Sequence, residues 1–327
     1  MSDKVIKTIE ISFLIAFFSG ILIGPLIIPF LKKLKFGQYI REEGPEAHKS
    51  KAGTPTMGGV IFLASLTIST VVSCTFIDDI DVKNTLAILL ATLAFGLIGF
   101  LDDFIKVVMK RNLGLRAYQK MGLQILASFG FAFYLQEYTH IGTDILIPFT
   151  VGKTIDLGVV FIPFVMFVMI GTANGSNFTD GLDGLATSVT IPIAIFFALM
   201  SIREDKDVEV VAFAFAGALL AFLIFNTYPA RVFMGDTGSL ALGGFVSSIA
   251  FVLKMPIIIV VVAFIYFFEV VSVMLQVVYF KATHGKRLFK MAPIHHHFEL
   301  CGFAETQVVC AFCVITVILC MLAYVII

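Results

Sequence analysis

Charged residues are scarce in this sequence of 327 amino acids. They make up only 14% of the chain, whereas hydrophobic residues make up 59%. A soluble domain of this length needs far more charged surface, so the composition excludes an ordinary soluble protein and indicates a membrane protein. Basic and acidic residues balance at 23 each, which gives no indication of a nucleic-acid partner.

Tryptophan is absent and cysteine is rare. Any aromatic belt at the membrane surfaces must therefore come from the 35 Phe and eight Tyr. The five cysteines are an odd number and lie mostly in apolar runs, which excludes a disulfide framework. Cys310 and Cys313 form a C-x-x-C motif without a second ligand pair, and packing is favoured there over metal or redox chemistry. Internal repeats are also absent, so residues 1–327 are predicted to form one polytopic membrane domain.

Long apolar segments occur at ten places in the chain. A bilayer core of about 30 Å requires roughly 20 mostly apolar residues in a helix. The first segment, residues 9–31, is too long for the apolar part of a signal peptide and lacks a clear cleavage site, so we expect it to be retained. The sequence therefore predicts an all-α integral membrane protein with ten transmembrane helices. The segments are centred near residues 20, 68, 93, 128, 165, 192, 217, 246, 268 and 318.

Basic residues gather on one side of these segments. The odd-numbered loops contain 16 of the 23 Lys and Arg residues, whereas the other side is rich in acids, as in residues 78–81 and 204–207. Because cytoplasmic loops carry an excess of Lys and Arg, we expect the odd-numbered loops in the cytoplasm and both termini outside. Lys4 and Lys7 oppose this orientation locally, but the six basic residues of the first loop outweigh them.

Three aspartates are predicted to lie at one membrane depth. Asp102 and Asp103 end the third segment, and Asp236 begins the eighth. Paired acids at a membrane boundary are costly unless water or a cation matches them, and acids at a helix C-terminus oppose the helix dipole. Mg²⁺ binds through one or two carboxylates together with substrate phosphates. We therefore expect a magnesium and phosphate site in a cleft that faces the cytoplasm, with a solvated helix end as the structural alternative.

Two further cytoplasmic loops are rich in glycine and polar residues. Residues 51–59 place two hydroxyls, one of them on Thr56, near Lys51, a combination that suits a phosphate. A basic loop at the membrane surface is the alternative. Residues 173–184 contain two Asp, two Asn, three Gly and no basic residue, so they suit close contact with a ligand. The alternative there is that Asp180 caps the next helix.

Residues 293–299, P-I-H-H-H-F-E, contain three adjacent histidines. Side chains at positions i, i+1 and i+2 of a helix diverge, so His295, His296 and His297 cannot all face one metal. We expect them instead to hydrogen-bond phosphate or another polar group of a substrate.

A polar stripe lies inside the ninth apolar segment. Glu269, Ser272 and Gln276 have the i, i+3, i+7 spacing of one helical face. A charge next to lipid is expensive, so the stripe is predicted to face the protein interior or a wet groove. Structural hydrogen bonding between helices is as good an interpretation as function, and the sequence assigns Glu269 no catalytic role.

Five motifs of this chain together resemble those of the bacterial phospho-N-acetylmuramoyl-pentapeptide transferases, within the polyprenyl-phosphate hexose-1-phosphate transferase superfamily. Each motif alone is a weak signal, but all five occur in order, on the predicted cytoplasmic side and over essentially the whole chain. They are K-A-G-T-P-T-M-G-G at 51–59, L-D-D-F at 101–104, N-x-x-D-G-L-D-G at 177–184, N-T-Y-P-A followed by M-G-D-T-G at 226–238, and P-I-H-H-H-F-E at 293–299.

The resemblance implies a reaction and a setting. In this family, phospho-MurNAc-pentapeptide moves from UDP-MurNAc-pentapeptide to undecaprenyl phosphate, which yields lipid I and UMP in peptidoglycan synthesis. A ten-helix fold, dependence on Mg²⁺, a homodimer and a location in the bacterial inner (plasma) membrane are implied as well. The alternative function is transfer of N-acetylglucosamine-1-phosphate, although the triple-histidine motif resembles the muramoyl-pentapeptide branch. A membrane transporter is a remoter alternative, because intramembrane acids also mark transport pathways.

Expected roles for individual residues follow from this reaction. Asp236 is expected to be the principal Mg²⁺ ligand with Asp103 assisting, and Asp102 to accept the remaining proton of the lipid phosphate. A two-step reaction with one of these aspartates as covalent nucleophile is the alternative. By the resemblance, Phe233 lies against uracil with Lys110 nearby, and the cleft is lined by Lys51, Lys120, Asn177, Asp180, Asp183 and Asn226. The candidate catalytic residues are Asp102, Asp103, Asp236, His295, His296 and His297.

Overall fold

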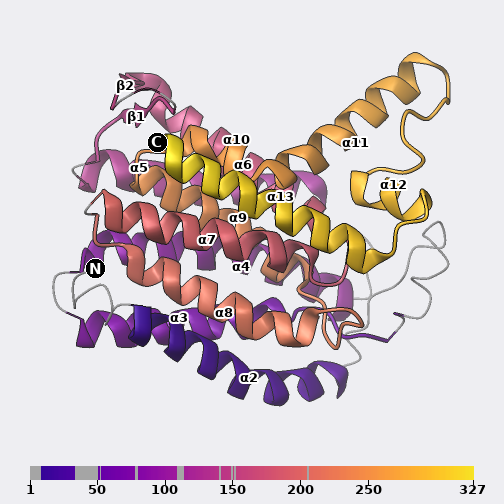
Figure 1. The fold of residues 1–327 in the computed structure, drawn as a ribbon, viewed down its shortest axis with the longest axis horizontal. Coiled ribbons are helices and arrows are strands. Elements are labelled where there is room, and N and C mark those ends of the chain that lie inside the picture. The colour runs from indigo at the N-terminus through magenta and orange to yellow at the C-terminus, as the bar shows by residue number, and fades with distance from the viewer. Residues whose placement is uncertain are drawn as a thin grey trace.

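The structure, a computed structural model, is a bundle of long helices that run side by side (Figure 1). It describes residues 9–33, 51, 53–77, 80–108, 114–139, 141–148, 150, 152–204 and 206–327. The long helices within these ranges are α2 (Leu14–Lys33), α3 (Gly59–Phe76), α4 (Val82–Val108), α5 (Ala117–Tyr138), α6 (Phe161–Thr179), α7 (Leu185–Arg203), α8 (Glu209–Asn226), α9 (Gly235–Val252), α11 (Phe264–Ala282) and α13 (Glu305–Ile326). The shorter helical elements are η1 (Ile9–Phe13), η3 (Gly158–Val160), η4 (Pro256–Ile258), α10 (Ile259–Val262) and α12 (Ile294–Leu300).

A long helix covers each of the ten predicted segment centres. Eight of the helices in the described ranges are long and apolar enough to cross a membrane, and α5 and α9 are not among these eight. The prediction of a helical, multi-pass membrane protein is therefore confirmed.

One short hairpin interrupts the helices between α5 and α6. Strand β1 (Asp144–Leu146) pairs antiparallel with β2 (Thr154–Asp156), with Ile145 opposite Ile155. A prediction of helices alone missed this hairpin, because strands of three residues are too short to show an alternating pattern. It lies at the end of the bundle away from α12 (Figure 1).

Helix α9 forms the centre of the bundle. It packs against α3, α4, α6 and α7, and every residue from Thr237 to Val252 is buried. Much of α9 consists of Gly, Ala and Ser, and such small residues let helices approach closely inside a membrane. Its first turn consequently lies among the ends of neighbouring helices rather than in open solvent.

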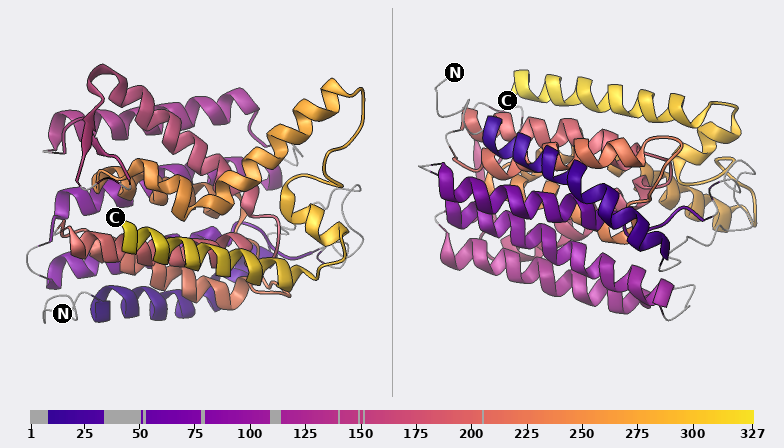
Figure 2. Two further views of the ribbon diagram at one scale, coloured as in Figure 1. Left: turned by 45° about the horizontal axis from the view of Figure 1, so that its top comes forward. Right: turned by 90° about the horizontal axis from the view of Figure 1, so that it is seen from below.

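The described ends of the chain both lie at the end of the bundle opposite α12 (Figure 1). Helix α2 begins at this end of the bundle, and α13 terminates at it. At the other end, α11 projects beyond the bundle and α12 folds back toward it (Figure 2). This second end collects the polar motifs of the sequence.

Candidate active site

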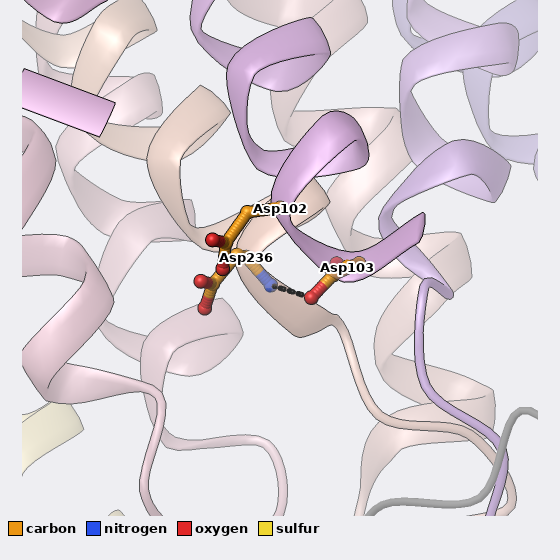
Figure 3. Close-up of side chains that lie close together, drawn as sticks. All are labelled: Asp102, Asp103 and Asp236. Carbon is orange, nitrogen blue, oxygen red and sulfur yellow. Dashed lines mark hydrogen bonds between the residues drawn. The ribbon is translucent and has the colours of Figure 1, made fainter. Parts of the chain in front are cut away.

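Three carboxylates converge where the C-terminal end of α4 meets the start of α9. One oxygen of each of Asp102, Asp103 and Asp236 lies within 4.8 Å of the other two. The carboxyl groups of Asp102 and Asp236 lie side by side, whereas that of Asp103 points toward the backbone of Asp236 (Figure 3). The prediction that the three aspartates meet is confirmed. The adjacent residues Asp102 and Asp103 have different hydrogen-bond partners.

Asp103 binds the first turn of α9. Its carboxylate accepts hydrogen bonds from the Asp236 N–H at 3.2 Å, the Thr237 N–H at 2.9 Å and the Thr237 hydroxyl at 2.7 Å. An acceptor at this place satisfies N–H groups that have no partner within the helix, and its charge suits the positive end of the helix dipole. Asp103 therefore fixes the backbone that carries Asp236.

A glycine allows α4 to pack this closely on α9. A Cβ at Gly99 would lie 1.9 Å from the backbone oxygen of Asp236, which is far inside contact distance. Gly235, directly before Asp236, has a φ of 71°, a left-handed conformation that glycine adopts without strain. A side chain at Gly99 would push Asp236 away from Asp102.

Two lysines and an amide surround the Asp236 carboxylate. Lys106 Nζ lies 2.6 Å from Asp102 Oδ2 and 2.9 Å from Asp236 Oδ2. Lys120 Nζ lies 2.8 Å from Asp236 Oδ2, and Asn177 Nδ2 donates to Asp236 Oδ1 at 2.9 Å. The structure thus brings Lys120 and Asn177 to the cluster and adds Lys106, which sequence reasoning missed. Its signal was available, because Lys106 follows Asp102 by four residues, about one helical turn.

Asp180 lies in the same acidic region, and no Lys or Arg of the described residues forms an ion pair with it. Asp180 follows the last residue of α6, and Gly184 precedes α7, so the alternative that Asp180 caps the next helix is wrong. Burial, and then the negative charges of Asp236 and Asp103, raise the pKa of Asp180 to about 8. Near neutral pH this carboxyl therefore holds a proton unless a cation is supplied.

Lys51 lies in a separate group of charges. Its Nζ is 2.7 Å from Asp183 Oδ1 and 2.6 Å from Glu305 Oε1. Glu305 also accepts the Asp183 N–H at 2.6 Å, and Asp183 Oδ2 accepts the Ala230 N–H at 2.9 Å. Burial lowers the pKa of Lys51, but hydrogen bonds to Asp183 and Glu305 outweigh it and leave that pKa above its ordinary value. Sequence reasoning missed Glu305, because it lies 254 residues after Lys51 and no local pattern links the two.

Asn226, expected in the cleft, orders the loop between α8 and α9. Its Oδ1 accepts a hydrogen bond from the Thr187 hydroxyl at 2.9 Å, and its Nδ2 donates to the Val232 carbonyl at 3.1 Å. The side chain is 2% exposed, so most of its hydrogen-bonding capacity is used inside the protein.

The backbone of Phe233 attaches the first loop to the same α8–α9 loop. The Phe233 N–H donates to the Pro55 carbonyl and the Gly58 N–H donates to the Phe233 carbonyl, both at 2.8 Å. Thr56, between these partners, is buried. The Phe233 side chain is half-buried, whereas Lys110 lies outside the described residues.

The three histidines have three different partners, as their adjacent positions in α12 predict. His295 is fully buried, and its Nδ1 lies 3.1 Å from Glu269 Oε1. His296 Nδ1 lies 2.8 Å from Glu299 Oε2. His297 Nδ1 accepts the Lys290 N–H at 3.1 Å. Their imidazoles therefore do not share one ligand.

The oxygen donors of the cluster fit a magnesium ion. Asp102 and Asp236 present carboxylates side by side (Figure 3). The Asp180 carboxyl is close enough to interact with the charges of Asp236 and Asp103. Mg²⁺ prefers such hard oxygen ligands and keeps positions for water and substrate phosphate. Two of the three donors to Asp103 are backbone N–H groups of α9, whereas the three donors to Asp236 are side-chain ends that can move away, so Asp236 is the freer of the two to bind an ion.

Comparison with known proteins identifies relatives along the whole chain. Residues 85–255 match the family model "Glycosyl transferase family 4", and residues 51–63 match "Phospho-N-acetylmuramoyl-pentapeptide-transferase signature 1". A phospho-N-acetylmuramoyl-pentapeptide-transferase of Clostridium kluyveri is 51% identical over 314 residues, which cover 96% of this chain and 97% of the relative. Enzymes of the same name from Clostridium botulinum and Clostridium perfringens are each 49% identical, over 97% and 99% of this chain and over 96% and 99% of their own lengths.

Proposed function

The chain belongs to the phospho-N-acetylmuramoyl-pentapeptide-transferase family, and we propose that it transfers phospho-MurNAc-pentapeptide from UDP-MurNAc-pentapeptide to undecaprenyl phosphate. The products are lipid I and UMP, and the reaction serves peptidoglycan synthesis. The main structural support for this proposal is that Asp102, Asp103 and Asp236 meet beside two lysines. Transfer between two phosphate groups depends mainly on positioning and on charge neutralisation, which such a cluster supplies.

The bonds that change lie at one phosphorus atom. An oxygen of the lipid phosphate attacks the phosphorus bonded to the sugar, and the bond from that phosphorus to the UMP oxygen breaks. Negative charge grows on the departing UMP, and the ammonium groups of Lys106 and Lys120 can turn from Asp236 to this charge. The Asp102 carboxylate accepts the remaining proton of the lipid phosphate. Its Oδ2 lies 2.6 Å from Lys106 Nζ. Conversion of Asp102 to Asn with near-normal kcat would contradict this assignment.

Asp236 is the residue that would hold Mg²⁺, with Asp103 positioning the backbone behind it. A bound Mg²⁺ neutralises pyrophosphate charge and orients the substrate. Asn177 donates to one oxygen of Asp236 and thereby orients the carboxylate.

Direct attack is favoured over a phosphorylated aspartate. Asp102 Oδ1 accepts the Leu115 N–H at 2.8 Å and its Oδ2 contacts Lys106, so neither oxygen is a free nucleophile. The oxygens of Asp103 and Asp236 also have donors. A phospho-enzyme trapped from labelled donor in the absence of lipid acceptor would decide for the two-step reaction.

The membrane arrangement we propose has ten crossings. Helix α5 has 22 residues and packs along α4 and α6, and α9 lies between helices that are themselves candidate spans. The start of α2 and the end of α13 lie at the same end of the bundle, which agrees with an even number of crossings (Figure 1). The excess of Lys and Arg in the odd-numbered loops supports a cytoplasmic active site in the plasma membrane, with external termini. The homodimer implied by the resemblance stays a prediction.

Release of UMP tests the proposed function. Purified protein in detergent is given UDP-MurNAc-pentapeptide, undecaprenyl phosphate and Mg²⁺, with EDTA and with Asp236→Ala as comparisons. We expect UMP that requires both substrates and disappears in both comparisons. Folded protein that releases UMP only from UDP-N-acetylglucosamine would instead establish the related transferase activity.

A further inference from the structure

Glu269 is a buried carboxylate that the proposed mechanism leaves unused. Helix α11 is exposed along most of its surface, and its buried side chains are confined to Ile265, Tyr266, Glu269 and Ser272. Glu269 itself is 0% exposed. Gln276, further along the predicted stripe, accepts the Phe289 N–H at 2.9 Å, so the stripe faces the protein as the sequence predicts.

The His295 imidazole faces the Glu269 carboxyl. His295 Nδ1 and Glu269 Oε1 are 3.1 Å apart, at hydrogen-bond distance but without good alignment. Within the described part of the chain, no Lys or Arg forms an ion pair with Glu269 and no aligned hydrogen bond reaches either oxygen. An unpaired buried carboxylate is strongly destabilising, so the imidazole N–H is the group that stabilises it.

The other nitrogen of His295, Nε2, faces the loop between α6 and α7. A Cβ added to Gly181 would lie 2.1 Å from His295 Nε2, so the ring edge rests directly on this glycine. Gly181 adjoins Asp180, and Asp183 follows two residues later in the same loop. His295 Nε2 is buried and has no hydrogen-bond partner among the described residues. An unpartnered polar atom at this place is a group prepared to accept a hydrogen bond from a substrate hydroxyl or from the Asp180 carboxyl.

We propose that Glu269 is a positioning residue for the transfer reaction, because its carboxylate holds His295 through Nδ1–H so that Nε2 faces the loop of Asp180. A carboxylate that accepts from one imidazole nitrogen fixes both the tautomer and the ring orientation, and thereby keeps the other nitrogen as an acceptor. This inference rests on the proposed function and adds a residue outside its predicted site.

A double-mutant cycle tests whether Glu269 acts through His295. Glu269→Leu should lower kcat for UMP release about 10- to 100-fold, the usual effect of removing such an orienting partner, with little change in KM. Glu269→Gln should recover part of the loss, since its amide oxygen still accepts from Nδ1–H. In the His295→Ala background, Glu269→Leu should cause no further loss, whereas independent effects that multiply would overturn the inference. Ser272→Ala, one turn along the same buried stripe, is the matched control and should keep kcat.

Histidine nitrogen NMR gives a readout that does not depend on activity. In protein labelled with ¹⁵N-histidine, the His295 signals are assigned by their loss in His295→Ala. We expect Nδ1 protonated and Nε2 unprotonated in the unaltered protein, and a changed tautomer in Glu269→Leu. An unaltered protein with the proton on Nε2 alone would overturn the inference even if UMP release is as proposed. The expected tautomer without UMP release would contradict the proposed function and leave the His295 geometry established.

Discussion

Two groups of charges lie at the same end of the bundle, and they hold their charges differently. The Asp236 cluster consists of Asp102, Asp103, Asp236, Lys106 and Lys120, and the Lys51 cluster consists of Lys51, Asp183 and Glu305. In the Asp236 cluster, the Asp236 carboxylate accepts hydrogen bonds from the side chains of Lys106, Lys120 and Asn177. In the Lys51 cluster, both carboxylates also accept backbone N–H groups, from Asp183 and Ala230.

This difference separates a site that exchanges partners from a joint that holds segments together. Lys106 and Lys120 can leave Asp236 for a phosphate while the hydrogen bonds of Asp103 still join α4 to α9. Release of Lys51 from Glu305 and Asp183 would detach the first loop from the α6–α7 loop and from the start of α13. We infer that the same residue types serve reaction in one cluster and assembly in the other.

The largest effect is expected at Asp236, where activity and stability should separate. Asp236→Asn should lower kcat about 10³-fold, because stabilisation of phosphoryl charge by a held metal ion is worth several kcal/mol. The melting temperature in detergent should change little, since Lys106 still pairs with Asp102. UMP release and thermal melting measure the two quantities. Asp144→Asn, in the hairpin at the far end of the bundle, is the matched control, and an equal loss of stability at Asp236 would erase the contrast between the clusters.

Substitution of Asp103 should lower both stability and activity. Asp103→Asn places an amide N–H against donors from Asp236 and Thr237, and an unsatisfied buried donor costs about 1–3 kcal/mol. We expect a lower melting temperature together with a roughly 10²-fold loss of kcat, the scale set by misplacement of a catalytic group. A loss of kcat at an unchanged melting temperature would instead make Asp103 a direct ligand of metal or phosphate.

The sequence was sufficient to predict the helices and the meeting of the aspartates. Hydropathy located all ten long helices, and the order of the loops placed Asp102 and Asp236 at one end of the bundle. The distinct contacts of Asp102 and Asp103 are a consequence of helical geometry, since adjacent residues point about 100° apart. Asp102 contacts Lys106 and the Leu115 N–H, whereas Asp103 contacts the backbone of α9.

Other features depend on distant packing and were not predictable. The meeting of Glu305 with Lys51, and of Glu269 with His295, joins segments that no short pattern connects. The sequence also left open whether Asp180 caps a helix. That choice depended on a few backbone angles in a glycine-rich loop, where Gly184 takes a left-handed φ of 76°.

Glu305→Gln should test the joint with a smaller effect on activity. The change removes one charge from a mostly buried ion pair and should lower the free energy of unfolding by about 1.5–3 kcal/mol, the range for hydrogen bonds to charged groups. Activity should fall less than in Asp236→Asn, with the change mainly in KM, because Lys51 keeps Asp183. Thermal melting and initial rates across donor concentrations measure both. Glu204→Gln, an exposed glutamate after α7, is the control, and a large fall in kcat without lower stability would place Lys51 in the chemistry instead.

The smallest effect is a slope of stability with pH, which distinguishes Asp180, beside the Asp236 cluster, from the Lys51 cluster. Folding raises the pKa of Asp180 from 3.8 to about 8, so the folded state binds more protons than the unfolded state between these values. Stability should therefore fall as pH rises through this window and change little from this group above pH 8. The raised pKa of Lys51 acts in a different window, because its stabilisation is complete below its ordinary value of 10.5 and is lost only as pH rises through the still higher folded value. In melting temperatures recorded without Mg²⁺ from pH 5 to 8, Asp180→Asn should reduce the slope and Glu305→Gln should leave it unchanged. A slope that is unaffected by Asp180→Asn would contradict the raised pKa of this carboxyl in the folded protein.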